Sequence, residues 1–433
     1  MKVLLVGGGG REHALAWRLR HEVPDIEIIA APGNPGISEL ATCVPVAATD
    51  VDALVALARA ERVDWTLVGP EAPLAAGIVD EFRRAGLPIF GPTRAAAMLE
   101  SSKAFSKTLM IEAGVPTARA IACSTVDAAF RAIALIGGDA PVVVKASGLA
   151  AGKGVVICNT APQARDAARS MLEANAFGDA GATVLIEEFM TGEELSVFVL
   201  TDGERMIPLP AAQDHKRLLD GDLGPNTGGM GAYSPVSIVE HSPELIGEVL
   251  ASVVSPTLAA MRARETPFTG LLYVGLMLTD DGPRVVEFNA RYGDPETEAV
   301  LPALSPDSSM CAAMFAIARG ERLPAHVQLE AVQSAVTTVV AATGYPEKPR
   351  TGDSIEIPTV PAGVHVFHAG TKRDASGALV TAGGRVLAIT GVADSLDEAQ
   401  RLSQEFAEAV RFDGKQFRTD IAWREMARRA GAT

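Results

Sequence analysis

The chain has 433 residues, 48% of them hydrophobic, which is enough for several cores and, at roughly 150 residues per domain, for about three domains. Its net charge of −15 at pH 7 argues against sequence-independent binding of DNA or RNA, which needs a basic surface, but allows small anionic substrates in a local basic pocket. Its four cysteines lack C-x-x-C spacing and no apolar run approaches the ~18 residues of a membrane span, so we expect a cytoplasmic protein with reduced thiols.

The N-terminal part of the chain alternates short apolar strands with helices. Strands are predicted at Lys2–Val6, Ile26–Ala31, Thr66–Gly69 and Pro88–Gly91, and helices at Arg11–Leu19 and Leu74–Arg84. Strands that alternate with helices predict an α/β fold with a parallel, doubly wound sheet.

A run of four glycines, Gly7–Gly10, joins the first strand to the first helix. A dinucleotide fingerprint would need a further glycine where Glu12 or His13 stands, and the second strand ends at Ala30–Gly33 without an acid for a ribose diol. Two interpretations remain. Backbone N–H groups at the helix start hold a phosphate, with Arg11 as a partner, or the glycines serve a tight turn.

The apolar strand Pro141–Ala146 ends in a lysine, Lys145, and runs into the glycine-rich segment Gly148–Gly154. This segment is not a Walker A loop, because its glycines have the wrong spacing, no Ser or Thr follows Lys153, and a strand comes next. It is either a β-hairpin that covers phosphates or a mobile surface hairpin. A lysine at the end of a buried strand favours the first, since it needs an anion.

A second apolar strand, Val184–Met190, runs into acids and Gly192. Glu187, Glu188, Phe189 and Glu194 form a candidate edge for a nucleobase and its ribose, although a solvated turn has the same composition.

Further along, the polar cluster Gln213–Arg217 precedes the glycine-rich segment Pro225–Tyr233, which is too long for a simple turn. Long loops in compact domains are usually functional or disordered, and the adjacent polar cluster favours function. The other predicted elements here are helices at Ser101–Glu112, Ala161–Glu173 and Pro243–Arg264, and a hairpin of Leu195–Leu200 with Arg205–Pro210.

A metal site is predicted on the strand that pairs with Leu271–Leu278 across a turn at Asp281-Gly282. Glu287 and Asn289 are two residues apart on this strand and therefore share a face. Carboxylate and carboxamide oxygens suit Mg²⁺ or Mn²⁺. Arg291 continues this face with a cationic fork for an anion. The alternative is an edge strand with a solvated acid, and no acid in the partner strand completes a ligand set for a second ion.

Taken in order, these stretches resemble the phosphoribosylamine–glycine ligase family, ATP-grasp enzymes of purine biosynthesis. The resemblance covers Met1 to about Trp423 and rests on Gly9–Ala14, Val68–Leu74, Gly148–Val155, Gln213–Arg217, Gly224–Pro235, Glu287–Asn289 and Arg291–Thr297. Asp214–Arg217 and Asn226–Tyr233 are specific to this ligase rather than to ATP-grasp proteins at large. Ser147 and Ala290 depart from the family, which usually has Asp at the first position and often Cys at the second.

The resemblance implies three domains: residues 1–104 for phosphoribosylamine, an ATP-grasp domain at 105–327 with a mobile lid at about 123–190, and a small α/β domain at 328–433. The sequence pattern of residues 328–433 fits an α/β domain. It predicts strands at Val332–Ala341, Val364–His368 and Gly384–Ile389 and a helix at Ser395–Val410. The implied reaction joins glycine to 5-phosphoribosylamine at the expense of ATP, through glycyl phosphate.

The resemblance also implies roles for individual residues. The implied metal ligands for Mg²⁺ or Mn²⁺ are Glu287 and Asn289. The implied ATP-binding residues are Lys103, Lys145, Gly152, Lys153, Gly154, Glu187, Glu188, Phe189 and Glu194. The implied substrate-binding residues are Gly9, Gly10, Asp214, Lys216, Gly228, Gly229, Met230, Arg291, Asp294 and Pro295. Lys145, Arg291 and Asp294 would be catalytic. We expect a monomer that binds ATP, glycine and phosphoribosylamine, and neither nucleic acid nor a membrane.

Three other classes of protein remain to be weighed. A different ATP-grasp carboxylate–amine ligase is opposed by the Asp214 and Asn226 motifs. A nicotinamide oxidoreductase is opposed by the missing glycine and ribose acid. A non-catalytic nucleotide-binding module would not need Lys145, Glu287 and Arg291 together, and it would bind nucleotide without turnover.

Overall fold

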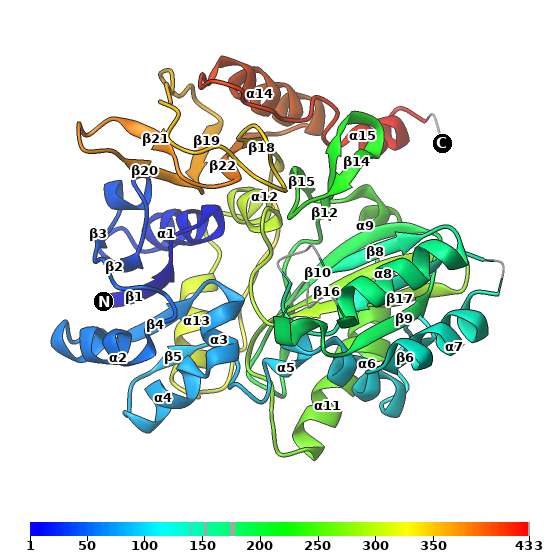
Figure 1. The fold of residues 1–433 in the computed structure, drawn as a ribbon. Helices are drawn as coiled ribbons and strands as arrows, with labels where there is room; N and C mark the ends of the chain where they lie inside the picture. The colour runs from blue at the N-terminus through cyan, green and yellow to red at the C-terminus, as the bar shows by residue number, and fades with distance from the viewer. Residues whose placement is uncertain (139, 151–153, 174–177, 432–433) are drawn as a thin grey trace.

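The computed structural model describes residues 1–138, 140–150, 154–173 and 178–431. Figure 1 shows an α/β unit at the N-terminus, a larger mixed unit beside it and a third layer, formed largely by the C-terminal part of the chain, above both. This confirms the predicted mixed α/β class with several sheets.

The N-terminal sheet is parallel, as predicted, with strand order β3-β2-β1-β4-β5. Its strands are β1 (Lys2–Gly7), β2 (Glu27–Pro32), β3 (Thr42–Cys43), β4 (Trp65–Val68) and β5 (Ile89–Phe90), and its helices include α1 (Gly10–Glu22) and α2 (Val51–Ala60). The helix predicted at Leu74–Arg84 is wrong in its bounds. It starts earlier and forms two helices, α3 (Glu71–Ala76) and α4 (Ile78–Arg84), because Gly77 between them has a left-handed backbone with φ +92°.

An antiparallel sheet with order β6-β9-β7-β8 carries the predicted glycine-rich hairpin. Its strands are β6 (Ala120–Cys123), β7 (Val142–Ala146), β8 (Val155–Cys158) and β9 (Val184–Glu188), and α7 (Val126–Ile136) and α8 (Ala161–Glu173) pack against it. β7 pairs antiparallel with β8, so the strand–loop–strand prediction is confirmed, while Gly152 and Lys153 lie outside the described residues. The sheet and its helices enclose their own hydrophobic cluster.

A second antiparallel sheet has the order β11-β10-β16-β17. Its strands are β10 (Glu193–Thr201), β11 (Met206–Pro208), β16 (Gly270–Thr279) and β17 (Gly282–Asn289), and nearby helices are α5 (Met98–Ser101), α6 (Lys103–Glu112), α10 (Glu244–Val249) and α11 (Ser255–Ala263). A π-helical turn joins α10 to α11. The combined helix is the one described helix long and apolar enough to cross a membrane, which is weak evidence by itself, since Val253 and Met261 lie in the core.

The third antiparallel sheet has an order that the sequence pattern did not predict, β12-β15-β18-β22-β19. β18 (Ser334–Ala341), β19 (Val364–His368) and β22 (Arg385–Ala393) come from the C-terminal part, with α14 (Leu396–Ala409) packed on them. β12 (Gln213–Asp214) and β15 (Gly231–Ser234) come from mid-chain. The remaining elements near this sheet are β13 (Arg217–Leu219), β14 (Leu223–Asn226), β20 (Thr371–Arg373), β21 (Leu379–Thr381), α9 (Ser237–His241), α12 (Glu296–Ala303) and α15 (Trp423–Arg429). α13 (Met310–Ala318) packs instead against β4 and β5 of the N-terminal sheet.

The segment predicted as one long glycine-rich loop is therefore mostly strand. β14 and β15 occupy its two ends, and only residues 227–230 lie between them. Gly231 allows the tight pairing, because a Cβ there would lie 2.6 Å from the carbonyl oxygen of Thr337 on β18 and 2.5 Å from Ile421. The glycines serve close packing between distant parts of the chain, which a local pattern cannot show.

Candidate active site

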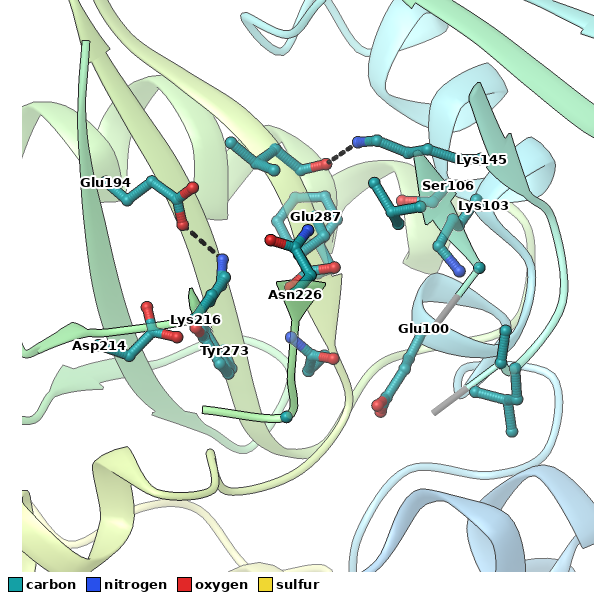
Figure 2. Close-up of a pocket in the computed structure, with 18 of the residues that line it drawn as sticks. Glu100, Lys103, Ser106, Lys145, Glu194, Asp214, Lys216, Asn226, Tyr273 and Glu287 are labelled. Atoms are coloured by element: carbon teal, nitrogen blue, oxygen red, sulfur yellow. Dashed lines mark hydrogen bonds and ion pairs between the residues drawn. The ribbon is translucent and has the colours of Figure 1, made fainter. Parts of the chain in front are cut away.

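A cavity of about 450 Å³ is lined by residues of all three antiparallel sheets and of the N-terminal unit. Most of the predicted polar residues line it, together with apolar side chains of the hairpin sheet such as Val143 and Ile157. Figure 2 shows Lys103, Ser106 and Lys145 on one side of this cavity, Glu194, Asp214 and Lys216 on the other, and Glu287 between them.

Glu287 and Asn289 both line the cavity, from one face of β17, as predicted. They stand opposite Gly275 and Tyr273 of β16, so the partner strand adds no acid. Burial raises the pKa of Glu287, but Lys216, Lys145 and Lys103 outweigh it, and the net shift is downward. The ionised carboxylate and the amide fit a Mg²⁺ ion, which takes one or two protein oxygens and completes its shell with phosphate and water. The described residues contain no group of three or more His, Cys, Asp or Glu with metal-site geometry.

Lys145 is held at the cavity by a buried carboxylate. Its Nζ lies 2.7 Å from Glu187 Oε2 and donates to the carbonyl oxygen of Val286 at 3.2 Å. Lys107 pairs with the other oxygen of Glu187 at 3.1 Å. The Glu187 side chain is thus engaged by two lysines, and contact with adenine would fall to the backbone of this strand rather than to its carboxylate.

Lys103 begins α6 beside the hairpin. Its backbone N–H donates to Ser147 O at 2.8 Å, and its Nζ donates to Gly148 O at 3.2 Å. Burial is the main cause of its lowered pKa. Gly154 also lines the cavity. The structure therefore brings together Lys103, Lys145 and the described part of the hairpin.

The predicted nucleotide edge also reaches the cavity. Glu188 pairs with Arg119 at 2.5 Å and with Arg284 at 2.8 Å, so its carboxylate is engaged in ion pairs. Phe189 lines the cavity with 40% of its surface exposed, which leaves an aromatic face for a flat ligand. Glu194 lies on the opposite side of the cavity, where it forms an ion pair with Lys216 (Figure 2).

Arg291 lies between two carboxylates that sequence reasoning missed. Its Nη2 is 3.0 Å from Glu100 Oε1 and its Nε is 3.3 Å from Glu71 Oε2. Glu100 is buried, and its second oxygen accepts the N–H of Ala290 at 2.8 Å. These contacts fix the guanidinium at the cavity wall. The motif around Glu71 was visible in the sequence, but nothing local indicated its partner.

Asp294 also lines the cavity and pairs with an arginine from β22, a strand of the third antiparallel sheet. Arg385 Nη1 lies 2.9 Å from Asp294 Oδ1 and donates to Gly228 O at 2.6 Å. A Cβ on Gly229 would lie 2.4 Å from Pro295, so this glycine permits the close approach of the two segments. No local sequence signal identified Arg385.

In the glycine run, one backbone N–H that could hold a phosphate is already engaged by the protein. The N–H of Gly9 donates to Glu12 Oε2 at 2.6 Å, and a Cβ on Gly10 would lie 2.6 Å from Glu298 Oε1. In this structure the glycines make room for acids. Five predicted residues are not among those that line the cavity: Gly9, Gly10, Gly229, Met230 and Pro295.

Asp214 ends β12, Lys216 follows two residues later, and both line the cavity. Burial is the largest cause of the raised pKa of Asp214, about 8, with Glu296 and Glu194 adding to it and Lys216 opposing it. The pKa of Lys216 is raised well above its ordinary value, because nearby acids outweigh its burial. Missed residues on this side include Tyr273, whose hydroxyl donates to Glu296 at 2.7 Å.

Ser106 is another cavity residue without a sequence signal. Its Oγ is buried and has no hydrogen-bond partner among the described residues. A buried hydroxyl of this kind is a candidate donor or acceptor for a bound ligand.

The sheets and the cavity between them define an ATP-grasp protein. Residues 1–100 match the family model described as "Phosphoribosylglycinamide synthetase, N domain", residues 101–297 match its ATP-grasp (A) domain, and residues 335–424 match its C domain. The ATP-grasp domain implies the use of ATP.

The relatives are consistent with these matches. The chain is 48% identical over 432 residues to the phosphoribosylamine–glycine ligase of Xylella fastidiosa (strain Temecula1), with 99% of each chain covered. It is 48% identical over 436 residues to that of Xanthomonas campestris pv. campestris, with 100% of each covered. The chain therefore belongs to the phosphoribosylamine–glycine ligase family.

Solved structures agree. The crystal structure of phosphoribosylamine–glycine ligase from Thermotoga maritima is 34% identical and superposes with a TM-score of 0.83, covering 98% of this chain and 100% of that one. The biotin carboxylase domain of Hydrogenobacter thermophilus 2-oxoglutarate carboxylase, in complex with MgADP, has a TM-score of 0.73 at 20% identity, covering 96% and 91%. The second likeness shows the shared fold alone.

Proposed function

We propose that this chain is an ATP-dependent ligase that joins glycine to 5-phosphoribosylamine, giving glycinamide ribonucleotide, ADP and phosphate through a glycyl phosphate intermediate. The observation that carries the proposal is the cavity in which Glu287 lies between Lys103 and Lys145 on one side and Lys216 on the other, with Asn289 also in its lining. The family of the chain supports the choice of substrates.

The chemistry explains why such a cavity is needed. A carboxylate is a poor electrophile, so its condensation with an amine requires activation. A carboxylate oxygen of glycine attacks the γ-phosphorus of ATP and ADP leaves. The amine of phosphoribosylamine then attacks the acyl carbon, loses a proton, and phosphate leaves. Both steps gather negative charge that fixed cations stabilise.

Nucleotide binding is assigned to two facing layers. Lys103, Lys145 and the hairpin through Gly154 contact the phosphates, with Glu187 holding Lys145 in place. The strand through Phe189 contacts adenine, and Glu194 contacts the ribose. Gly152 and Lys153 keep their proposed part in this hairpin, although they lie outside the described residues. The compact sheet of β6–β9, with its own core, supports a lid at about 123–190 that excludes water from the acyl phosphate.

A divalent cation, Mg²⁺ or Mn²⁺, would be held by Glu287 and Asn289. Once bound, it neutralises charge on the nucleotide phosphates. The chain's own contribution is to keep the Glu287 carboxylate ionised among lysines and to aim both oxygens from one strand face.

Arg291 is assigned to the glycine carboxylate or to the acyl phosphate, because Glu71 and Glu100 fix its guanidinium at the wall. Asp294 and Lys216 are assigned to phosphoribosylamine together with Asp214. Gly228 lines that part of the cavity, and Gly9, Gly10, Gly229, Met230 and Pro295 are assigned to shaping the same part of the site. Domain limits of 1–104, 105–327 and 328–433 belong to the same proposal.

We further propose that the protein acts as a cytoplasmic monomer on small molecules and binds neither nucleic acid nor a membrane. The acidic net charge supports the exclusion of nucleic acid.

The test is ADP release measured with ATP, Mg²⁺, glycine and phosphoribosylamine, each omitted in turn. We expect release only with all four. Release that persists without phosphoribosylamine but needs another amine would indicate a different ATP-grasp ligase. Nucleotide binding without any turnover would indicate a binding module.

A further inference from the structure

His215 occupies a position between two cavity residues but faces away from the cavity. Asp214 and Lys216 line the cavity, and His215 does not. The His215 side chain is 3% exposed and packs beside the ring of Tyr233. His215 follows directly after β12 and continues its backbone hydrogen bonding to the segment at Met230 and Gly231. Side chains alternate along such extended backbone, so a histidine between two cavity-lining residues points to the opposite side.

The ring nitrogens of His215 are engaged by the protein itself. Nε2 accepts the backbone N–H of Ala422 at 2.9 Å. This assigns the proton of the neutral ring to Nδ1, which lies 3.8 Å from Asp222 Oδ1 and makes no hydrogen bond with a described residue. Burial lowers the pKa of His215 despite the opposing effect of Asp222, so the ring is neutral. An imidazole in this setting has no free path to a reacting group in the cavity.

Ala422, whose N–H donates that hydrogen bond, belongs to a segment that is itself held by several contacts. Ala422 has a left-handed backbone with φ +69° and is fully buried, a conformation that persists in a non-glycine residue only where the surroundings over-determine it. Arg418 pairs with Asp222 at 2.8 Å, and the N–H of Thr419 donates to Asp220 at 2.9 Å. The segment Arg418–Ala422 is therefore fastened to the turn between β13 and β14. Figure 1 shows α15, which follows it, beside β14.

The backbone of His215 connects the anchored ring to the two neighbouring residues that line the cavity. Its N–H donates to Gly231 O at 2.9 Å, and its carbonyl oxygen accepts the N–H of Met230 at 2.7 Å. A shift of the ring would move the backbone from which Asp214 and Lys216 extend.

We propose that His215 is a positioning residue through which the segment Arg418–Ala422 sets Asp214 and Lys216 in the cavity. It acts as a hydrogen-bond acceptor and takes no part in proton transfer. The kinetic part of this inference rests on the proposed function, whereas the hydrogen bond that it invokes does not.

Three variants distinguish a positioning role of His215 from a role in proton transfer. His215→Gln keeps an acceptor at about the position of Nε2, His215→Leu removes it, and His215→Asn keeps a polar group that is too short. The matched control is His326→Leu, at an exposed histidine. The readouts are kcat and KM for each substrate across pH, and amide hydrogen exchange of the peptide that contains Ala422.

We expect His215→Gln to stay within about threefold of the parent enzyme, with the same pH profile. His215→Leu and His215→Asn should raise the KM for phosphoribosylamine about tenfold with a smaller change in kcat, as the loss of one buried hydrogen bond implies. Exchange at Ala422 should rise in these two variants alone. Should His215→Leu not fold, His215→Asn supplies the same comparison.

Two results would overturn the proposal. One is equal and large loss of kcat in all three variants with a changed pH profile, which indicates a catalytic imidazole. The other is unchanged exchange at Ala422 in His215→Asn. If the parent enzyme lacks glycine-dependent ADP release, the proposed function fails, and the exchange measurement still decides the anchor.

Discussion

Lys145 Nζ lies 2.7 Å from Glu187 Oε2 in a buried ion pair that joins two neighbouring strands of one sheet. The side chains are 8% and 4% exposed, and Lys107 meets the other carboxylate oxygen at 3.1 Å. Burial raises the pKa of Glu187, but the two lysines outweigh it and lower the pKa overall. The single ionised carboxylate of Glu187 thus pairs with both lysines and holds the Lys145 ammonium group at the cavity.

Replacing Glu187 with Gln should destabilise the protein, because it leaves two buried lysines without a counter-charge. Breaking a buried pair from one side costs about 3–5 kcal/mol. We expect a lower urea midpoint and weaker ATP binding, measured by equilibrium unfolding and calorimetry. The control is Glu321→Gln, whose ion pair with Arg319 is about half exposed on both sides and whose loss should cost less than about 1 kcal/mol. Equal stability of the two variants would contradict this account.

Replacing Glu287 with Ala should abolish turnover while the protein stays folded. The side chain lines the cavity, so its loss removes the proposed metal ligand rather than core packing. Metal ions supply several kcal/mol of charge stabilisation, so we expect a fall of at least about a hundredfold in kcat at limiting Mg²⁺. The matched control is Asp281→Ala in the exposed turn before the same strand. Near-normal turnover at limiting Mg²⁺ would exclude the ligand role.

The features of the site that local sequence predicts are those set by neighbouring residues. The shared face of Glu287 and Asn289 follows from the two-residue period of a strand that begins at a glycine turn. The hairpin around Gly148–Gly154 follows from two apolar runs flanking glycines. Both were predictable because the information lies within about ten residues.

The features that escaped prediction depend on pairing between distant segments. β15 pairs with β18 across about a hundred residues, for example Gly231 with Thr338, and no periodicity encodes that choice. The partners of Arg291 are similar. Glu100 and Glu71 come from the chain before the ATP-grasp sheets, and their carboxylates meet the guanidinium only after folding.

The pH dependence of stability should report on Asp214. A carboxyl whose pKa is raised on folding binds its proton more tightly in the folded state. Its stabilising contribution is full below the unfolded pKa of 3.8 and is lost as the pH rises to about 8. Asp214→Asn is neutral at every pH and escapes this loss.

We therefore expect Asp214→Asn to become more stable relative to the parent protein as the pH rises from 5 to 8, measured by urea unfolding at several pH values. The exposed Asp281→Asn variant serves as the reference, with a constant difference over the same range. A difference between Asp214→Asn and the parent that does not change with pH would show that Asp214 is ionised throughout.

The final prediction concerns the intermediate. In glycyl phosphate formation a carboxylate oxygen of glycine attacks the γ-phosphorus and later leaves with phosphate when the amine attacks. Glycine labelled with heavy oxygen in its carboxylate should therefore transfer one labelled oxygen to phosphate in each turnover, detected by mass spectrometry. Hydrolysis of ATP beside an unrelated condensation would take that oxygen from water. Both routes give the same bulk products, so only the origin of the oxygen separates them.

The same labelling experiment tests the roles of the cationic side chains, because Lys145 and Arg291 are placed to stabilise charge that develops during the attack. Lys145→Met and Arg291→Met should slow labelled phosphate and amide product together, since the acyl phosphate precedes both. Lys372→Met, at an exposed lysine of β20, should change neither. If phosphate from labelled glycine carried no label, the acyl phosphate route would be wrong, and with it the roles of both cations. If label transfer continued while only amide formation slowed, these residues would act after activation, on the attack by the amine.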